Sequence, residues 1–324
     1  MRIFIVSKLA WNLPSILVHQ TVCDLIAAGF LQSIAEIIVV SDGFNGILPP
    51  GATLMSTEEA ENLVISCANA AIIHFGSSIK GADHFPQYFI DLTHPKQLEE
   101  GFFANWMAQL AYNKTIKKAT KVFGWLDIPA PSLPSFEWSD LALAKSRNSG
   151  GDNYFMAFMP LVEIVPTLKE FSIFKKWQQT SMAILFVCKD QKELDKAEAL
   201  VKGYKYRNAV FFKLAETIDL IDFAAAYCTV WSSATNYYTR FMQWSAGLGV
   251  PLLINSKTNY AIAYTKAGES FDFTETMGLS NHFKLYYKDE VYKQSKANHG
   301  HAWFNQMTAE GSTKNASLLD RCLP

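Results

Sequence analysis

The sequence lacks an excess of either charge, because 29 lysines and arginines nearly balance 30 aspartates and glutamates. A domain that binds nucleic acid mainly through phosphate contacts needs a basic excess, so we expect no nucleic-acid partner. Charged residues are also scarce at 18%, whereas hydrophobic residues reach 49%. The 324 residues therefore contain enough apolar material for two cores, and bulk disorder is excluded.

Long apolar runs and paired cysteines are missing as well. No run reaches the roughly 18 apolar residues that span a bilayer, and the first residues, MRIFIVSK, predict a strand rather than a signal peptide. The five cysteines are odd in number, widely spaced and without a C-x-x-C pair, which is typical of free thiols in a reducing compartment. We therefore expect a cytoplasmic protein without a transmembrane segment. A peripheral contact with a membrane stays open.

Several motifs of nucleotide and hydrolytic chemistry are absent. The sequence contains no G-x-G-x-x-G, no P-loop and no G-x-S-x-G, which argues against an ordinary dinucleotide site, a P-loop site and a serine hydrolase. It has no D-x-D pair and no metal-ligand spacing, and His299 and His301 are interpreted as surface histidines. We therefore expect neither a metal nor a cofactor.

Short apolar runs that alternate with helix-like stretches dominate the sequence, and this pattern is typical of parallel sheets covered by helices on both faces. The strands expected are Ile3–Val6, Ile37–Val40, Ala71–Phe75, Tyr88–Leu92, Lys121–Trp125, Tyr154–Phe158, Met182–Val187, Ala209–Phe212, Thr229–Trp231 and Pro251–Ile254. The helices expected include Lys96–Thr120, Thr167–Gln178, Glu216–Ala226, Tyr237–Ala246 and Glu290–Met307.

A stretch rich in proline and glycine interrupts this alternation between residues 127 and 151, after which the alternation starts again. The sequence therefore predicts an α/β protein with two Rossmann-like, doubly wound domains that face a cleft. Their expected bounds are 1–130 and 154–324, with a linker at 131–153. Ligands of such folds bind at the carboxyl ends of the strands, so the function is expected on the loops that follow them.

The most specific stretch is 228–254, CTVWSSATNYYTRFMQWSAGLGVPLLI. An apolar strand ends at Trp231, and a turn of small residues that contains Ser232, Ser233 and Thr235 leads into a helix. The unpaired N–H groups at a helix start, with hydroxyls nearby, form a natural anion site. The same hydroxyls could instead simply cap the helix.

This stretch resembles the donor domain of the group 1 GT-B glycosyltransferases, a retaining, nucleotide-sugar class with a pattern close to S-x-x-E-x-F-G…E-A-M-A-x-G-x-P-V. Ser233, Gly249 and Pro251 match this pattern. The resemblance implies an acceptor-type N-terminal domain, a donor-type C-terminal domain, and metal-independent transfer of a sugar from a nucleotide-sugar to a glycan or related acceptor. We expect the donor-binding residues to be Ser232, Ser233, Thr235, Asn236, Tyr237, Arg240 and Gln243. The resemblance carries Ser233 and the position of Asn236, whereas the other residues are expected because they lie at or near the helix start, where Arg240 is the nearby cation, and Gln243 is the polar neighbour of the second glutamate position.

The sequence departs from the family pattern at four donor-site positions. The two glutamates of the pattern fall on Asn236 and Trp244, and the arginine and lysine that neutralise the donor diphosphate fall on Pro160 and Val165. Tryptophan cannot accept hydrogen bonds from ribose hydroxyls. The missing cations would weaken the stabilisation of the leaving group, which is a large electrostatic effect in such chemistry.

On the acceptor side, the stretch Ile90–Pro95 (IDLTHP) resembles the T-x-H stretch of the family. This resemblance maps His94 onto a histidine that binds and orients the transferred sugar, so His94 is the candidate catalytic residue. His74 ends the preceding expected strand, and Ser77 follows in a small-residue turn, so both are candidates for the acceptor-side cleft. A loop-capping role for His94 is an equally open interpretation.

Three functions remain open from the sequence. The first is an active glycosyltransferase with a divergent donor site. The second is a noncatalytic GT-B-like protein that binds a glycan or serves as a partner subunit. The third is an unrelated two-domain protein that closes around a small molecule, because a shared architecture does not decide function.

Overall fold

The computed structural model describes residues 1–7, 18, 22, 36–43, 48, 51–91, 102–124, 154–232, 239–255 and 272–320. Its contacts divide the chain into two units, residues 1–132 with 307–324 and residues 133–306. The chain from 307 onward is thus grouped with unit 1, whereas the sequence predicts it in the C-terminal domain. The expected linker at 131–153 lies outside the described residues. No described helix is long and apolar enough to cross a membrane.

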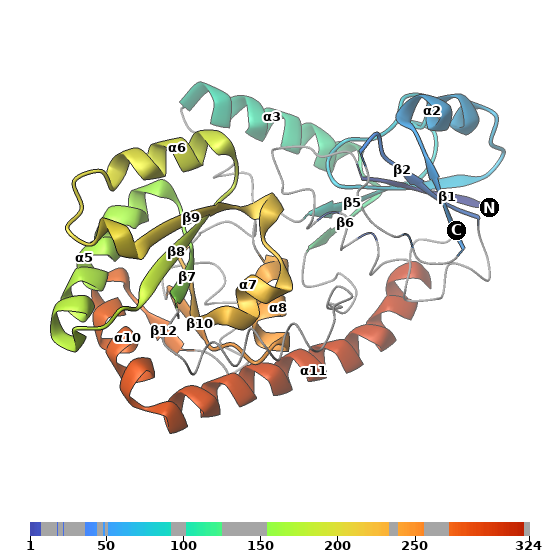
Figure 1. The fold of residues 1–324 in the computed structure, drawn as a ribbon. Coiled ribbons are helices and arrows are strands. Elements are labelled where there is room, and N and C mark those ends of the chain that lie inside the picture. The colour runs from blue at the N-terminus through green and yellow to red at the C-terminus, as the bar shows by residue number, and fades with distance from the viewer. Residues whose placement is uncertain are drawn as a thin grey trace. The chain divides into compact units, whose positions relative to one another are not determined.

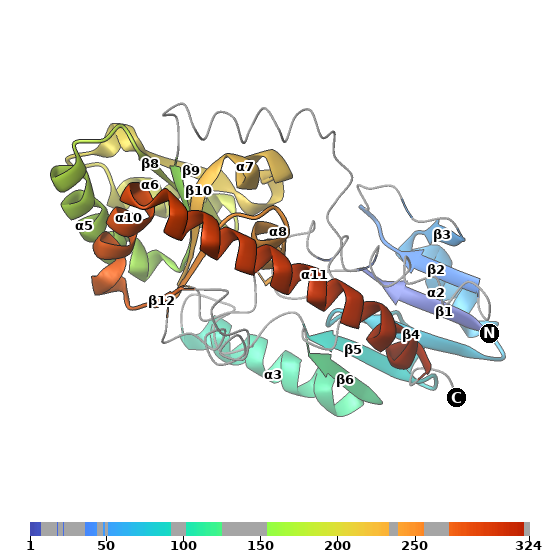
Figure 2. The ribbon, with the colours of Figure 1, turned by 90° about the horizontal axis from the view of Figure 1, so that it is seen from below.

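Unit 1 contains a parallel sheet with the strand order β3-β2-β1-β4-β5-β6, and its strands β1, β2, β5 and β6 are labelled in Figure 1 and all six in Figure 2. Its strands are β1 Arg2–Val6, β2 Glu36–Val40, β3 Ala52–Met55, β4 Ala70–His74, β5 Gln87–Asp91 and β6 Lys121–Gly124. The central strands β1, β2 and β4 are almost continuous runs of buried apolar residues. Such runs are typical of parallel strands that are covered on both faces.

Two described helices belong to unit 1, α2 (Thr57–Ile65) and α3 (Phe102–Lys118). Helix α2 begins at a capping box, in which the Ser56 hydroxyl accepts from the N–H of Glu59 and the Glu59 side chain accepts from the N–H of Ser56. Asp42, at the end of β2, accepts hydrogen bonds from the N–H and the hydroxyl of Thr57 at 2.8 and 2.7 Å. These contacts link the start of α2 to the carboxyl end of the sheet.

Unit 2 repeats the same topology in its own parallel sheet, with the order β12-β11-β10-β7-β8-β9. Its strands are β7 Tyr154–Phe158, β8 Ala183–Cys188, β9 Val210–Leu214, β10 Ala226–Trp231, β11 Leu252–Asn255 and β12 Asp272–Thr274. Its helices are α5 Leu161–Gln178, α6 Gln191–Leu200, α7 Leu220–Ala225, α8 Thr239–Gly247 and α10 Leu279–Lys288, together with the first part of α11 Glu290–Asp320, whose residues from 307 are grouped with unit 1. Short 3-10 turns lie at Arg207–Ala209, Ala215–Thr217 and Thr276–Gly278.

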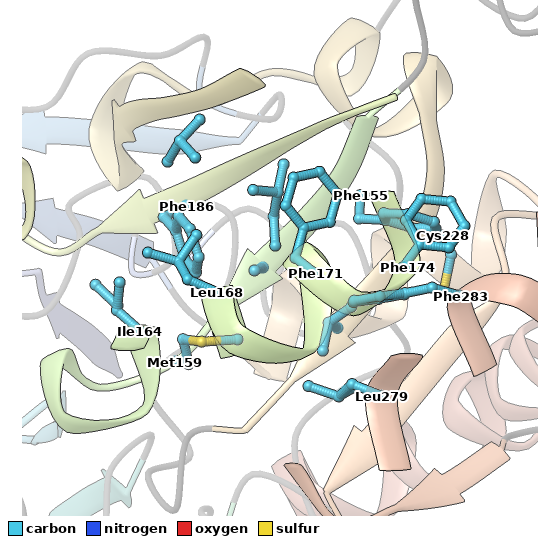
Figure 3. Close-up of a cluster of buried hydrophobic side chains, with 14 of the residues drawn as sticks. Phe155, Met159, Ile164, Leu168, Phe171, Phe174, Phe186, Cys228, Leu279 and Phe283 are labelled. Carbon is cyan, nitrogen blue, oxygen red and sulfur yellow. The ribbon is translucent and has the colours of Figure 1, made fainter. Parts of the chain in front are cut away.

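The core of unit 2 forms where one face of this sheet meets α5 and α10 (Figure 3). Phe155 of β7 stacks on Phe283 of α10 at a centroid distance of 4.2 Å and meets Phe171 and Phe174 of α5 edge-on. All four rings are fully buried. Offset and edge-on ring pairs each add about 0.5–1.5 kcal/mol to the free energy of area burial, so this cluster is a main source of stability.

The observed elements differ from the expected ones in several places. Helix α5 begins at Leu161 rather than Thr167, because burial of Ile164 and Leu168 offsets the hydrogen bond that Pro166 cannot make. Helix α7 is shorter than expected and β10 begins where it ends. The sequence pattern did not predict the strands β3 and β12 or the helix α10.

Helix α11 is longer than expected and its first half packs on the end of α8. The Nδ1 atom of His301 lies 2.8 Å from the carbonyl oxygen of Gly247, the last residue of α8. A Cβ on Gly247 would lie 3.0 Å from the ring of Phe304, so glycine permits this close approach. His301 is exposed, as the sequence predicts, and it also contacts the carboxyl end of a helix.

Candidate functional site

The candidate site lies at the carboxyl ends of the central strands of each unit. The order of the strands reverses between β1 and β4 in unit 1 and between β7 and β10 in unit 2. Ligands of doubly wound folds bind outside the strand ends at such a switch point. The register pairs Val6 with His74 and Phe158 with Trp231. These residues therefore mark the positions where ligands of each unit are expected.

His74 is the last residue of β4 and is only 2% exposed. Its ring stacks on Phe89 at a centroid distance of 5.6 Å, and the N–H of Gly76 donates to Nδ1 at 3.2 Å. Burial lowers the pKa of His74 to about 4, so the ring is neutral at pH 7. Because Nδ1 accepts a hydrogen bond, the ring proton is assigned to Nε2. A ring in this state can donate to an oxygen acceptor but carries no charge.

The chain turns sharply after His74. Gly76 has a φ of 113°, a backbone conformation that side chains other than hydrogen rarely permit. Ser77 follows this turn and is half-buried. The turn therefore keeps His74 and Ser77 at the switch point of unit 1, at the end of the strand where the sequence analysis expects them.

In unit 2, the chain passes from β7 into α5 at Pro160, which caps the helix without a side-chain hydrogen bond. Val162 is 78% exposed in the first turn, and Val165 is also exposed. Glu163 is the charged residue of this turn, and its Oε2 atom accepts from the Thr276 hydroxyl at 2.8 Å. A diphosphate at this helix start would therefore find backbone N–H groups and a carboxylate, but no cation from the first turn of α5.

Strand β10 ends beside β7 in a layer of buried aromatic rings. Trp231 stacks on Phe158 at a centroid distance of 3.9 Å. Ser232 follows, is nearly buried, and donates its N–H to the carbonyl oxygen of Phe158 at 2.9 Å. The backbone hydrogen bond to Phe158 and the packing of the neighbouring Trp231 ring therefore both hold Ser232 in place.

Helix α8 is held against β10 by a buried hydroxyl network that the sequence analysis did not anticipate. The Thr229 and Ser245 hydroxyl oxygens lie 2.8 Å apart, and the Trp231 Nε1–H donates to the Thr229 hydroxyl at 2.9 Å. Further bonds at 3.3 and 3.4 Å reach the carbonyl oxygens of Pro251 and Val250. Buried polar groups with satisfied partners favour one arrangement of the packed elements. The network therefore fixes the position of α8 relative to β10.

Two residues of α8 lie at or beside the position where the family pattern has the glutamate that binds the ribose hydroxyls. Gln243 is buried, and Trp244 is fully buried, with its ring 5.1 Å from that of Phe241 and 6.2 Å from that of Phe223. Trp244 therefore belongs to the aromatic layer and offers no acceptor where the family pattern has its second glutamate. Gly249 has a φ of 67°, which explains glycine at that matched position.

No family model and no curated protein matches the sequence, but many solved structures are similar to it. HepE from Anabaena, in complex with UDP and glucose, has a TM-score of 0.66 and 12% identity, with 99% of both chains covered. WaaG, a glycosyltransferase involved in lipopolysaccharide biosynthesis, has a TM-score of 0.63 and 10% identity, with 98% of this chain and 99% of WaaG covered. The chain has the GT-B fold. The fold expected from the sequence is thereby confirmed.

The GT-B fold does not by itself select a reaction. A protein from Listeria monocytogenes assigned as a UDP-N-acetylglucosamine 2-epimerase is also similar, with a TM-score of 0.53 and 9% identity over 92% of this chain and 90% of its own. Identities this low show the fold alone, because unrelated activities share folds. The chemistry of the site must therefore carry the argument about function.

Five of the ten predicted site residues of this GT-B chain lie outside the described residues. These are His94, Ser233, Thr235, Asn236 and Tyr237, and the side chain of Arg240 in α8 is likewise not described. His74 and Ser77 are at the switch point of unit 1, and Ser232 is at that of unit 2. Among the described residues, no group of three or more histidine, cysteine, aspartate or glutamate side chains is placed to hold a metal ion.

Lys189 is a further candidate site residue that the sequence analysis missed, at the carboxyl edge of the sheet of unit 2. It directly follows β8, where the register pairs Val187 with Phe158 of β7. Pro160, the cap of α5, lies two residues beyond Phe158, so Lys189 and Pro160 follow neighbouring strands at the same edge of the sheet. A lysine directly after an apolar strand was the available signal.

Proposed function

We propose that this protein is a glycosyltransferase that moves a sugar from a nucleotide-sugar donor to a glycan or related acceptor. The observation that supports it most is the pair of switch points, one in each sheet of a GT-B fold that spans the whole chain. Neighbours of this fold hold UDP or UDP-glucose, as HepE does. A donor site in unit 2 and an acceptor site in unit 1 follow from this proposal.

In the proposed reaction, the bond between the anomeric carbon and the diphosphate oxygen breaks, and its electron pair stays on the diphosphate. The acceptor hydroxyl oxygen bonds to the anomeric carbon and gives its proton to the departing diphosphate oxygen. Negative charge accumulates on the leaving diphosphate, so the site must supply positive charge or hydrogen-bond donors. We assign this role to the turn that begins at Ser232, to Arg240 and to Lys189, with no metal and no cofactor.

On the acceptor side, His94 is proposed as the catalytic residue that orients the transferred sugar. His74 is proposed as a neutral hydrogen-bond donor at the end of β4, because its protonated form is disfavoured by burial. Ser77 is proposed as a further acceptor-side contact, and Gln243 as a further donor-side contact. We also propose a cytoplasmic location, as expected from the unpaired cysteines. The proposal includes no nucleic-acid partner.

Thermal unfolding of the whole chain in the presence of UDP, UDP-glucose and other nucleotide-sugars tests the proposal. A ligand that binds only the folded state at a hundred times its Kd stabilises that state by about 2.7 kcal/mol, so a specific donor should raise Tm measurably. Release of the nucleoside diphosphate in the presence of glycan acceptors then tests transfer. No Tm shift with any nucleotide or nucleotide-sugar would contradict the proposed donor class.

Substitution of Lys189 tests its assigned role more sharply. Lys189→Gln should weaken diphosphate binding several-fold, because one charge near the proposed ligand is lost. Lys192→Gln is the matched control, since Lys192 is exposed on α6 only three residues away. Equal binding by the wild type and Lys189→Gln would remove Lys189 from the site.

The noncatalytic alternative is favoured by the first turn of α5 and by Trp244. Glu163 and two exposed valines stand where a diphosphate would need cations, and Trp244 is buried where ribose would need an acceptor. Under this alternative the protein binds a glycan or a partner protein and turns over no donor. Glycan binding without any nucleotide binding would support it.

A further inference from the structure

Cationic and aromatic side chains from three elements of unit 2 meet at the last turn of α5. Lys176 and Trp177 are exposed on this turn, Trp177 by 52%. The segment before β9 contributes Lys205 and Tyr206, and α10 contributes Lys284. We call this set, which also includes the half-buried Lys175 of α5, the basic α5 surface: Lys175, Lys176, Trp177, Lys205, Tyr206 and Lys284.

Ring contacts connect these residues on two sides of α5. On one side, the ammonium groups of Lys175 and Lys205 lie 6.0 and 5.3 Å from the centre of the Tyr206 ring. On the other side, the ammonium group of Lys284 lies 5.4 Å from the centre of the Trp177 ring. Each aromatic ring of the surface therefore has at least one cation beside it.

Lys176 connects the two sides. At about 100° per residue, it lies midway between Lys175 and Trp177 around the axis of α5. Figures 1 and 2 both show α10 beside α5, which agrees with the contact between Lys284 and Trp177. The basic α5 surface is therefore continuous from the segment before β9, across the end of α5, to α10.

Among the described residues, no carboxylate forms an ion pair with any of the four lysines of this surface, whereas Lys213 and Lys293 of the same unit do form such pairs. The Lys175 ammonium donates instead to the carbonyl oxygens of Thr180 and Met182 at 2.6 and 2.9 Å. Burial lowers the pKa of Lys175, and no acidic group offsets this effect. In a chain with a net charge of −1, the surface is a local concentration of uncompensated positive charge.

The basic α5 surface lies at the opposite edge of the sheet from the candidate donor site. Tyr206 precedes β9, and the carbonyl groups that Lys175 contacts precede β8, so the surface is at the amino edge. Helix α5 begins after Pro160 at the carboxyl edge, and its 18 residues extend about 27 Å. A ligand of this surface therefore does not occupy the candidate donor site.

We propose that the basic α5 surface binds the chain of an acidic glycan. Carboxylate or phosphate groups of the glycan pair with the ammonium groups, in charge-assisted hydrogen bonds that are stronger than neutral ones. The half-exposed ring of Trp177 offers an apolar face on which the C–H groups of a sugar ring can pack. The choice of a glycan rests on the proposed function, in which the acceptor is a glycan.

The two aromatic rings also position lysines for this ligand. An ammonium group over an aromatic ring is attracted by the quadrupole of the ring. Long side chains that are restrained before binding lose less conformational entropy when the ligand arrives. Tyr206 and Trp177 therefore favour positions of Lys205 and Lys284 in which their charges are ready to pair with an anion.

Fluorescence anisotropy of a labelled oligogalacturonate, which has a carboxylate on every sugar, tests the proposal with the whole chain. We expect binding at low salt, weaker binding as salt screens the charges, and much weaker binding of a labelled neutral maltooligosaccharide of the same length. The double variant Lys176→Gln/Lys284→Gln should weaken binding of the oligogalacturonate by about five-fold. Trp177→Ser should also weaken it.

The matched control is Lys114→Gln/Lys117→Gln on α3, which removes the same charge from exposed positions of unit 1. This variant should bind the oligogalacturonate as the wild type does. The Tm of each variant without ligand shows whether it is folded. The Tm shift with UDP-glucose is measured separately, so its absence would contradict the proposed donor site and not the basic α5 surface.

Three results would overturn the proposal. The first is no binding of the oligogalacturonate to the wild type at low salt. The second is unchanged binding by Lys176→Gln/Lys284→Gln, which would place the anion elsewhere. The third is equal or tighter binding of a polyglutamate peptide with the same number of carboxylates, which would assign the surface to an acidic protein segment.

Discussion

At the scale of single residues, His74 illustrates how burial sets chemical state. The residue is at the end of a central strand, where a ring nitrogen already accepts a backbone N–H. Desolvation disfavours the charged ring, and no other cause contributes to its lowered pKa. The sequence predicted a histidine at a strand end, but its neutral state follows from packing against Phe89 and the rest of the sheet.

His74 should make stability depend on pH. Its pKa falls from 6.5 in the unfolded chain to about 4 in the folded one, so the unfolded state binds a proton first as pH falls. The free energy of unfolding should therefore decrease between pH 6.5 and pH 4, by about 3 kcal/mol from this residue. Urea unfolding of the wild type and His74→Asn at both ends of this range measures the contribution. An equal loss in both proteins would contradict it.

Gly249 should be sensitive to substitution through its backbone alone. Its φ is 67°, and a Cβ there would meet no atom within 4 Å. Gly249→Ala should therefore lower the free energy of unfolding by about 1–2 kcal/mol, the cost of the left-handed conformation, without a steric effect. Gly203→Ala is the control, because its surroundings are equally open and its φ is ordinary. Equal stability of the two variants would refute this explanation.

At the scale of elements, the strands with continuous buried apolar residues were predictable and the edge elements were not. The continuous apolar runs of β1, β7 and β8 predict buried strands. Edge strands such as β3 are short and partly exposed, so their apolar content is weak. The helix α10 had a usable signal, since Leu279, Phe283 and Tyr286 recur at helical spacing and are buried.

The hydroxyl network of β10 and α8 should stabilise unit 2. Thr229→Val keeps the shape of the side chain but removes the acceptor of the Trp231 Nε1–H and leaves the Ser245 hydroxyl with only the longer bond to the carbonyl oxygen of Val250. We expect the free energy of unfolding to fall by about 1–3 kcal/mol, because unsatisfied buried donors are costly. Thr217→Val is the control, since the Thr217 hydroxyl bonds to Leu214 at an exposed position. A double-mutant cycle with Ser245→Ala measures the coupling.

At the scale of the whole molecule, both units have the same strand order, and each has one switch point. The sequence predicted two α/β halves and a cleft function, but the candidate site depends on which strands become neighbours. Ser232 and Lys189 are far apart in the chain. The strands before them, β10 and β8, both pair with β7, so both residues follow strands at the same carboxyl edge of the sheet of unit 2. Local patterns do not encode such pairing.

The end of α11 should contribute to unit 1 rather than to unit 2. Contacts group residues 307–324 with residues 1–132. Truncation after Gln306 should therefore increase amide hydrogen exchange in β1 and β2, while exchange in β7 and β8 stays close to that of the whole chain. Mass spectrometry of the exchanged peptides measures both regions in one experiment. Faster exchange confined to β7 and β8 would contradict this grouping.

The sequence alone specifies the parallel α/β architecture, because buried strands and intervening helices have local apolar patterns. It also places glycine at Gly249, and it places Pro160 and Val165 where the family pattern that it resembles has an arginine and a lysine. Tertiary structure alone specifies that Trp244 is buried in an aromatic layer, that burial lowers the pKa of His74, and that the strand before Lys189 pairs with the strand before Pro160. These properties depend on burial and strand register, which arise from contacts between residues distant in the chain.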